Sequence, residues 1–251
     1  MVVGKIFIFD NMKKTDFFLL LFLLIFLLGS CGPARFVEPL AKNENAIAVD
    51  LGGPLVNVPG LATIPIPFSS ITYGRGISNS LTVHGSWYTT SAVFGVAQVG
   101  GGATYRFWKS KNLKHGVTGM IGFNTAVDVF ENNFKFWPQL DGHYYFKYNH
   151  RSLTQDDLLN KGGRPAANVL YAGIGTWYEL GRIKAHGEKQ ETFIVPMLNI
   201  GHDFNWKKWT LKTEFKLIAP FSSNDDIVMD YISITGKKGA TGLYIGLIRK
   251  F

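Results

Sequence analysis

The sequence predicts an all-β protein, and more specifically a closed antiparallel membrane β-barrel of about ten strands, within a range of eight to twelve. Three observations favour this class: apolar and polar side chains alternate over many segments, several of these segments have ten or more residues, and some connections are very short. A tilted strand needs about 9–11 residues to cross a bilayer. A sheet in a membrane has to close, because lipid cannot hydrogen-bond to a free strand edge.

The segment 209–218 shows the alternation most clearly. Trp, Leu, Phe and Leu dominate its odd positions, whereas Lys212, Glu214 and Lys216 occupy even ones. Successive side chains of a strand point to opposite faces, so the three charged groups share one face. A barrel of about ten strands has a narrow interior, and we therefore expect a plugged polar network rather than an open channel. Its expected members are Asn124, Asp128, Asp141, His143, Lys147, Lys212, Glu214 and Lys216.

Ten segments have strand character. We expect strands at residues 45–52, 64–77, 81–90, 93–108, 117–129, 134–148, 168–180, 192–206, 209–218 and 240–251. The connections 78–80 and 207–208 are short enough to force antiparallel neighbours. If the N-terminus is periplasmic, both short turns fall on the periplasmic rim and the long connection 219–239 falls outside. The connection 149–167 then falls inside, and we expect a short helix around 154–159.

The first residues have the features of an export signal. Residues 17–28 are an unbroken apolar run that follows Lys13 and Lys14. In a helix this run spans about 18 Å, whereas a membrane-spanning helix needs about 20 apolar residues. The pattern therefore predicts a signal peptide at residues 1–30. Met12, followed by two lysines, has the form of a translation start, and we expect the true start there.

The segment Leu28-Gly29-Ser30-Cys31 resembles the lipobox of bacterial lipoproteins. The resemblance implies cleavage before Cys31, a diacylglycerol on its sulfur, and a further acyl chain such as palmitate on its amine. Each buried CH₂ contributes about 0.8 kcal/mol, so two or three chains anchor a protein firmly. An ordinary signal peptide with a chance cysteine is the alternative. Cys31 is the sole cysteine, which excludes an internal disulfide.

The rest of the chain divides into a tether and one domain. Residues 31–44 contain two prolines and no periodic pattern, so we expect a lipidated tether there and the barrel domain at 45–251. Three of the 26 basic and two of the 18 acidic residues lie in residues 1–30, which leaves 23 against 16 and a mature charge of +7. A basic balance suits the membrane and anionic head groups, including those of lipopolysaccharide. Export past the inner membrane excludes nucleic acid as a partner.

The C-terminus carries a second resemblance. The chain ends on Phe251, and Leu243, Ile245 and Leu247 precede it at even spacing. This pattern resembles the terminal signature of outer-membrane β-barrels, which their assembly machinery recognises. Arg249 departs from the signature, because an apolar residue is usual at that position. The resemblance implies an outer-membrane location and the assembly machinery as a partner.

Candidate catalytic groups are few. His84 and Ser86 share one strand face, about 7 Å apart. They resemble the His-x-Ser pair of outer-membrane lipid A deacylases, in which serine is the nucleophile and histidine the base, oriented by an acid. The sequence does not place the acid, and a polar lumen face is the alternative. No metal-ligand spacing or phosphate loop occurs in the sequence, so no metal or cofactor is expected.

Three functions fit these observations. The leading hypothesis is a lipid-anchored outer-membrane β-barrel lipoprotein, not evidently catalytic, with a structural, adhesive or small-solute (porin-like) role in the cell envelope. The second is an outer-membrane lipid A-modifying hydrolase that uses His84 and Ser86. The third is a soluble periplasmic β-domain lipoprotein that binds a ligand or partner. Whether the chain is an enzyme stays open, and the sequence favours a non-enzymatic role.

Overall fold

The computed structural model describes residues 33, 35–58, 60, 62–130, 134–148, 167–181, 193–224 and 230–251. Three sequence predictions fall outside these residues: the signal peptide 1–30, the lipidated Cys31 and the short helix around 154–159. No helix among the described residues is long and apolar enough to cross a membrane.

Almost every described element is a strand. The strands are β1 (Asn45–Val58), β2 (Ala62–Pro65), β3 (Ser69–Ser78), β4 (Leu81–Tyr88), β5 (Val96–Lys109), β6 (His115–Asp128), β7 (Phe134–Tyr148), β8 (Asn168–Tyr178), β9 (Ile194–Asn205), β10 (Trp209–Ser223) and β11 (Lys238–Lys250). A short helix, α2 (Thr89–Val93), follows β4. The all-β prediction is confirmed.

The sheet closes on itself. The strands follow the order β11-β10-β9-β8-β7-β6-β5-β4-β3-β1, and β11 pairs again with β1. All of these pairs are antiparallel, and β2 only extends β1 outside the ring, so ten of the eleven strands form the barrel. At the seam the backbones of Asn45 and Phe251 exchange hydrogen bonds of 3.0 and 2.9 Å. The predicted closed antiparallel ten-stranded barrel is confirmed.

One expected strand is wrong in its bounds. The segment 64–77 forms two strands, β2 and β3, with a break at residues 66–68. Pro65 and Pro67 lie at this break, and proline has no N–H to donate to a sheet ladder. The chain therefore leaves the barrel wall here, and β2 pairs instead with the end of β1, which continues to Val58.

The connection after β4 also differs from the expectation. Strands were expected at 81–90 and 93–108, but α2 takes the last two residues of the first expected strand and the first residue of the second. Gly95 then adopts a φ of 77°, a left-handed conformation that glycine accepts without a steric penalty. The helix and this turn reverse the chain, and β5 begins at Val96.

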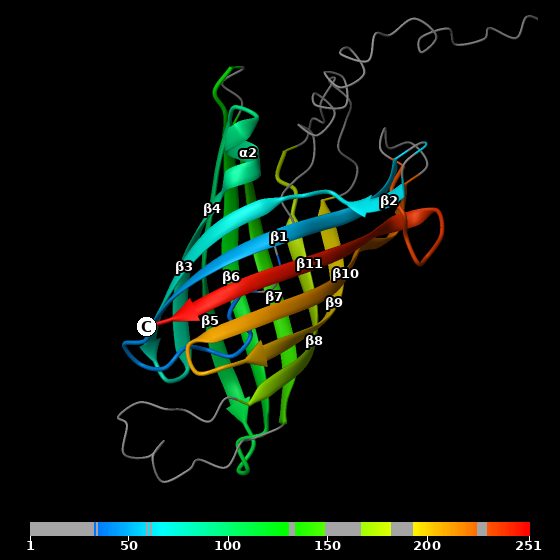
Figure 1. Cartoon of the computed structure of the whole chain (residues 1–251). Helices are drawn as coiled ribbons and strands as arrows, with labels where there is room; N and C mark the ends of the chain where they lie inside the picture. Colours follow the sequence, from blue (N-terminus) through cyan, green and yellow to red (C-terminus); the bar gives the residue numbers. More distant parts are fainter. Residues whose placement is uncertain are drawn as a thin grey trace, which may run out of the picture.

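The two ends of the barrel differ (Figure 1). One end, called here the C-terminal rim, carries the C-terminus and the connections at 79–80, 110–114 and 206–208. The other end, called the loop rim, carries α2 and β2. The short connections expected at 78–80 and 207–208 therefore lie on the same rim, as an antiparallel order requires.

The outer face of the barrel is apolar. Its strands expose aliphatic side chains in alternation, among them Ile47, Val49, Leu51, Ile71, Ile77, Val83, Val99, Ile121, Leu140, Leu170, Ile174, Leu198, Ile200, Leu243, Ile245 and Leu247. A continuous apolar band of this kind is unfavourable in water and matches the hydrocarbon of a bilayer. The barrel is thus built as a membrane-spanning barrel.

Exposed aromatic side chains gather toward the two rims. Those near the C-terminal rim include Tyr105, Phe107, Trp206, Trp209 and Phe251, and those near the loop rim include Trp87, Phe130, Phe134 and Phe193. Amphipathic rings favour the bilayer–water interface, and transmembrane barrels carry such girdles on both sides of the apolar band. The girdles bound the part of the wall that faces hydrocarbon.

Candidate functional site

Part of the chain itself lies inside the barrel. Residues 33 and 35–44, called here the N-terminal segment, precede β1 and contain no helix or strand. The side chains of Phe36, Val37 and Leu40 are only 5%, 1% and 3% exposed. The sequence had predicted an irregular tether in this region, and its place inside the barrel is a finding that the sequence reading did not predict.

Apolar side chains of the segment pack on the inner wall. Val37 forms a buried cluster with Tyr145, Val169 and Tyr171, which come from β7 and β8. On the other side of the lumen Phe36 and Leu40 form a second cluster, and its remaining members are Ala46, Ala48 and Ile248. The segment therefore contacts strands on both sides of the barrel, as a plug would.

Arg35 provides the deepest charge of the segment. Its guanidinium forms an ion pair with Asp50 of β1 and donates a hydrogen bond of 2.9 Å to Ser70 Oγ of β3. The side chains of Arg35 and Asp50 are 8% and 5% exposed. Thr104 Oγ1 of β5 donates to the carbonyl of Arg35 at 3.4 Å. A buried charge is strongly unfavourable without a partner, so these contacts fix the segment in one position.

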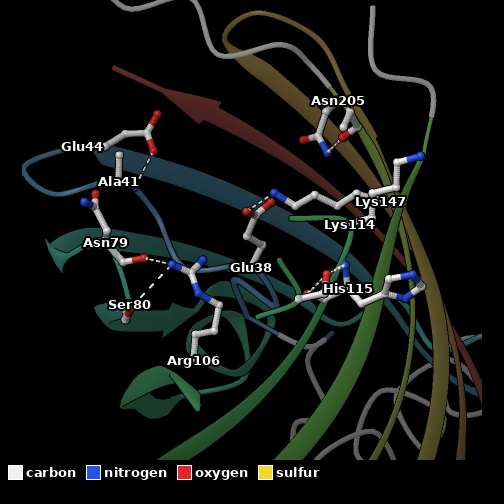
Figure 2. Close-up of polar contacts among 12 residues, drawn as sticks. Glu38, Ala41, Glu44, Asn79, Ser80, Arg106, Lys114, His115, Lys147 and Asn205 are labelled. Atoms are coloured by element: carbon white, nitrogen blue, oxygen red, sulfur yellow. Dashed lines mark hydrogen bonds and ion pairs between the residues drawn. The ribbon is translucent and has the colours of Figure 1, made fainter. Parts of the chain in front are cut away.

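Nearer the C-terminal rim the segment has further polar partners. Figure 2 shows Glu38 and Lys147 facing each other, and they form an ion pair between the segment and β7. The backbone N–H of Leu40 donates to Thr82 Oγ1 at 2.8 Å. Glu44 accepts a hydrogen bond of 2.8 Å from the backbone N–H of Ala41, which closes the turn that leads into β1 (Figure 2).

Two glycines of β3 make room for the segment. A Cβ at Gly74 would lie 2.4 Å from the Phe36 ring, and a Cβ at Gly76 would lie 1.8 Å from the carbonyl oxygen of Ala41. Real Cβ atoms do not approach other atoms so closely, so no larger residue fits at either position while the segment is in place. The wall and the segment are therefore complementary in shape as well as in charge.

A polar network lines the part of the lumen that β8, β9 and β10 form. Lys212 of β10 pairs with Asp203 of β9 at 2.7 Å and also donates to Tyr171 Oη at 3.4 Å. Tyr171 Oη donates to Glu214 at 2.7 Å, and Lys216 pairs with Glu214 at 3.3 Å. The charges thus alternate in sign along a chain of contacts, which is how buried charges avoid an unpaired state.

The expected interior residues are largely where the alternation puts them. Asn124, His143, Lys212, Glu214 and Lys216 are buried in the lumen. They were expected to pair with one another, but some of them have other partners. Lys147 forms its ion pair with Glu38 of the segment. Asp128 ends β6 and accepts a hydrogen bond from the backbone N–H of Phe130. Partners from outside the expected set complete the network.

Sequence reasoning missed four of those partners. Arg35 and Glu38 lie in the aperiodic segment, where no alternation marks an inward side chain. Asp203 and Tyr171 lie in segments recognised as strands, and the same alternation that found Lys212 would have placed them inward. Adjacent His202 faces away from Asp203 and contacts the Tyr148 hydroxyl at 2.5 Å, as expected for neighbours on a strand.

A small cavity lies above the segment, toward the loop rim. Its volume is about 40 Å³, and its lining includes Pro33, Tyr88, Asn124, Gln139, Asp141 and Lys216. A buried water needs at least about 10–15 Å³, so the cavity has room for a few waters but not for a sugar or an amino acid. Among the described residues, this cavity therefore offers no space for such a ligand.

His84 and Ser86 both point into the lumen, not toward lipid. Ser86 Oγ is hydrogen-bonded to Thr72 Oγ1 at 2.8 Å. The His84 ring lies 6.0 Å from the Phe36 ring, centroid to centroid, and its Nδ1 has no hydrogen-bond partner. Among the described residues no contact joins the two side chains and no carboxylate orients His84. In the same part of the chain, no group of three or more His, Cys, Asp or Glu is placed to hold a metal ion.

The closed ring, the apolar exterior and the polar, filled lumen together define a transmembrane-type β-barrel. No family model matches the chain, and no curated protein matches it. Solved structures similar to it include a de novo designed transmembrane β-barrel (12% identity, 85% of this chain and 99% of that one, TM-score 0.32). The N-terminal β-barrel domain of Pseudomonas aeruginosa OprF is also similar (10% identity, 84% and 100%, TM-score 0.32). So is Ail, the attachment invasion locus protein of Yersinia pestis (10% identity, 84% and 99%, TM-score 0.27). The fold assignment rests on the strand register of the chain itself.

Proposed function

We propose that this protein is a lipid-anchored outer-membrane β-barrel lipoprotein with a closed lumen and a structural or adhesive role in the cell envelope. The observation that carries the proposal is the N-terminal segment, held inside the barrel by the Arg35–Asp50 and Glu38–Lys147 ion pairs. A catalytic or transport site needs an accessible cavity, whereas here the chain uses its interior for its own stability. Passage of a small solute would require displacement of the segment.

Three features support an outer-membrane location. The exterior carries an apolar band between two aromatic girdles. The last strand exposes Leu243, Ile245 and Leu247, and Phe251 directly after it is exposed as well. The outer-membrane assembly machinery could reach all four side chains there. The export signal and Cys31 supply the route and the lipid. Each is expected of an outer-membrane lipoprotein that spans the membrane with its own barrel.

The distribution of basic residues suggests the lipid that contacts the protein. Exposed or partly exposed lysines at the C-terminal rim include Lys42, Lys111, Lys114, Lys207, Lys208 and Lys250. If the C-terminus is periplasmic, as in other outer-membrane barrels, this ring faces the phospholipid leaflet. Each basic residue near an anionic surface contributes about 1 kcal/mol of attraction. Anionic phospholipid therefore fits this rim better than lipopolysaccharide, which occupies the opposite leaflet.

The decisive experiment removes the lipid and asks whether the barrel stays in the membrane. Cys31→Ala protein should remain in the outer-membrane fraction after carbonate or urea washes, and should need detergent for extraction. Unheated samples should migrate differently from heated ones on a gel, because the closed barrel persists in mild detergent. Release of the variant by carbonate alone would overturn the proposal and favour a soluble periplasmic domain held only by its lipid.

A second measurement tests the closed lumen. The purified protein in a planar lipid bilayer should give no steady ion conductance. The double variant Arg35→Ala/Phe36→Ala, which removes the deepest ion pair and an apolar anchor of the segment, should give intermittent openings. Steady conductance of the unaltered protein would show that the segment does not close the lumen and would favour a porin-like role.

A further inference from the structure

The N-terminal segment rises through the barrel when it is followed backward from β1. Leu40 and Ala41 lie at the C-terminal rim, since their partners Thr82 and Gly76 stand near the ends of β4 and β3 there. The ion pair of Glu38 with Lys147, one residue from the end of β7, lies at the same level. The segment therefore enters β1 from inside the barrel, through the C-terminal rim.

The earlier residues lie progressively farther from that rim. Phe36 contacts the mid-strand positions Gly74 and His84. Arg35 reaches Asp50, five residues into β1, and Ser70, near the opposite end of β3. Each step toward the N-terminus is thus a step toward the loop rim.

Pro33 continues this course. It lines the small cavity together with Tyr88, and Tyr88 is the last residue of β4, directly before α2 on the loop rim. Asn124 and Gln139, which line the same cavity, also lie in the loop-rim halves of β6 and β7. Arg35 lines this cavity as well. Pro33 and Arg35 therefore lie in the loop-rim half of the lumen, whereas Glu38, Leu40 and Ala41 lie near the C-terminal rim.

The lumen below Pro33 leaves no room for a second passage of the chain. Tyr145, Tyr171 and Lys212 are 0%, 1% and 1% exposed, and the segment itself occupies the remaining width through its two apolar clusters. The cavity of about 40 Å³ beside Pro33 is also too small for a returning strand. Beside Pro33, space for a further length of chain is therefore left only toward the loop rim.

We propose that the mature chain is threaded through its own barrel, so that its N-terminal lipid is displayed on the loop rim, on the side of the membrane opposite the C-terminus. This inference rests on the proposed function, because it concerns the lipid on Cys31. Cys31 precedes Pro33 by two residues, which span at most about 7 Å at 3.3–3.6 Å per residue. With the C-terminal rim in the periplasm, the anchor belongs to the cell-surface side.

The alternative topology makes the opposite prediction. In a barrel with an even number of strands, a tether that stays outside the lumen leaves both chain ends on the same side of the membrane. A lipid on such a tether would sit in the periplasmic leaflet. The two topologies therefore differ in the side on which the N-terminus is found relative to the C-terminal rim.

The test uses the full-length, lipidated protein in cells, with one short epitope inserted at one of three places. The first is between Gly32 and Pro33, one residue after the lipid-bearing cysteine. The second is in the C-terminal-rim turn, between Lys111 and Asn112, and the third is in the exposed turn of the loop rim, between Thr235 and Gly236. Antibody binding is measured on intact cells, on permeabilised cells and after denaturation.

Threading predicts that the 32/33 and 235/236 epitopes are detected on intact cells, whereas the 111/112 epitope needs permeabilisation. If the 32/33 epitope, like the 111/112 epitope, is detected only after permeabilisation, the inference is overturned. Detection only after denaturation would overturn it too, since the chain would then have no exit at the loop rim. Heat-dependent gel mobility shows that each tagged barrel is folded.

Failure of the proposed function would look different. If the 235/236 epitope is also hidden on intact cells, the barrel does not present its loop rim on the surface. One-sided proteolysis of isolated membrane vesicles then still decides the topology: the 32/33 site is cut together either with the 235/236 site, which supports threading, or with the 111/112 site, which overturns it. A point variant, Gly32→Cys, replaces the 32/33 insertion if that insertion prevents folding. Because Cys31 is the only other cysteine and carries the lipid, labelling of the introduced thiol by a membrane-impermeant maleimide from one side or the other gives the same decision.

Discussion

β3 and β10 belong to one barrel wall, but they fill the lumen in different ways. β10 sends Lys212, Glu214 and Lys216 inward, and these large side chains occupy their part of the interior themselves. β3 offers only small inward residues, and the N-terminal segment fills the space in front of them, with Phe36 over Gly74. On the β10 side, the side chains of the wall itself fill the lumen. On the β3 side, the wall offers only small side chains, and the N-terminal segment fills the remaining space.

The difference has a physical consequence. Charges on β10 and β9 have partners on the same strand or on a neighbouring one, so their pairing is made as soon as the sheet forms. Asp50, by contrast, is satisfied by Arg35 from the segment. Pairing of the β10 charges should therefore depend on the sheet alone, whereas pairing of Asp50 should depend on whether the segment is inside. Two substitutions test this contrast directly, and two smaller ones test other contacts of the barrel wall.

The largest effect is expected from Lys212→Met. The substitution leaves Asp203 buried without its cation, and removal of one partner of a buried pair costs about 3–5 kcal/mol. Urea unfolding of the detergent-solubilised barrel, followed by tryptophan fluorescence, measures the change in the free energy of unfolding. The control is Lys212→Met/Asp203→Leu, which removes both charges and should recover most of the loss. Equal stability of the single and double variants would show that this pair is not buried from solvent.

Gly76→Ala should have the next largest effect, and it acts on the β3 side. Its Cβ would lie 1.8 Å from the carbonyl oxygen of Ala41, so the segment has to move, at a cost of about 1–3 kcal/mol. Trypsin should then cut faster at Lys42 in the displaced segment. Gly142→Ala is a matched control, because no heavy atom lies within 4 Å of its Cβ position. Similar cleavage of both variants would mean that β3 does not hold the segment in place.

The same contrast explains what the sequence could predict. Strand alternation identified the ten barrel strands and placed Lys212, Glu214 and Lys216 inside, because a pleated strand alternates its faces with a period of exactly two residues. This rule needs only local sequence. The inward position of these three charged residues could therefore be predicted from the sequence alone.

The sequence did not predict that the N-terminal segment fills part of the lumen, and the reason is again physical. The residues of this segment follow no period, so nothing local distinguishes a buried segment from a solvated tether. Its fit depends on residues far apart in sequence, such as Arg35 with Ser70 and Glu38 with Lys147. Gly74 and Gly76 were the available hint, since two glycines at alternate positions of one strand indicate close approach by another part of the chain. The break at Pro67 was readable too, because proline lacks an N–H.

Ser86→Ala should have a smaller effect and should separate two functions. Loss of the hydrogen bond to Thr72 Oγ1 should lower the free energy of unfolding by about 1 kcal/mol. With a plugged lumen, the acylation of lipid A in cells that carry Ser86→Ala or His84→Ala should equal that in cells with the unaltered protein. Mass spectrometry of extracted lipid A makes this comparison. Altered acylation with intact barrel folding would instead support the hydrolase hypothesis.

The smallest effect is expected outside the lumen, at Arg249. Its guanidinium lies 5.4 Å from the Trp209 ring centroid on the outer face of the C-terminal rim. An exposed contact between a cation and an aromatic ring contributes about 0.5–1 kcal/mol, so Arg249→Leu should lower the free energy of unfolding by that amount, and Arg249→Lys should lower it less. The sign of this change in the free energy of unfolding also indicates how deep Arg249 lies in the bilayer. An arginine on the outer face of a barrel is unfavourable by about 2–4 kcal/mol at the bilayer midplane, whereas near the interface the penalty is about 0–1 kcal/mol. Stabilisation by about 2 kcal/mol or more in Arg249→Leu would place this rim within the hydrocarbon, and would contradict the assignment of Trp209 to an interfacial girdle.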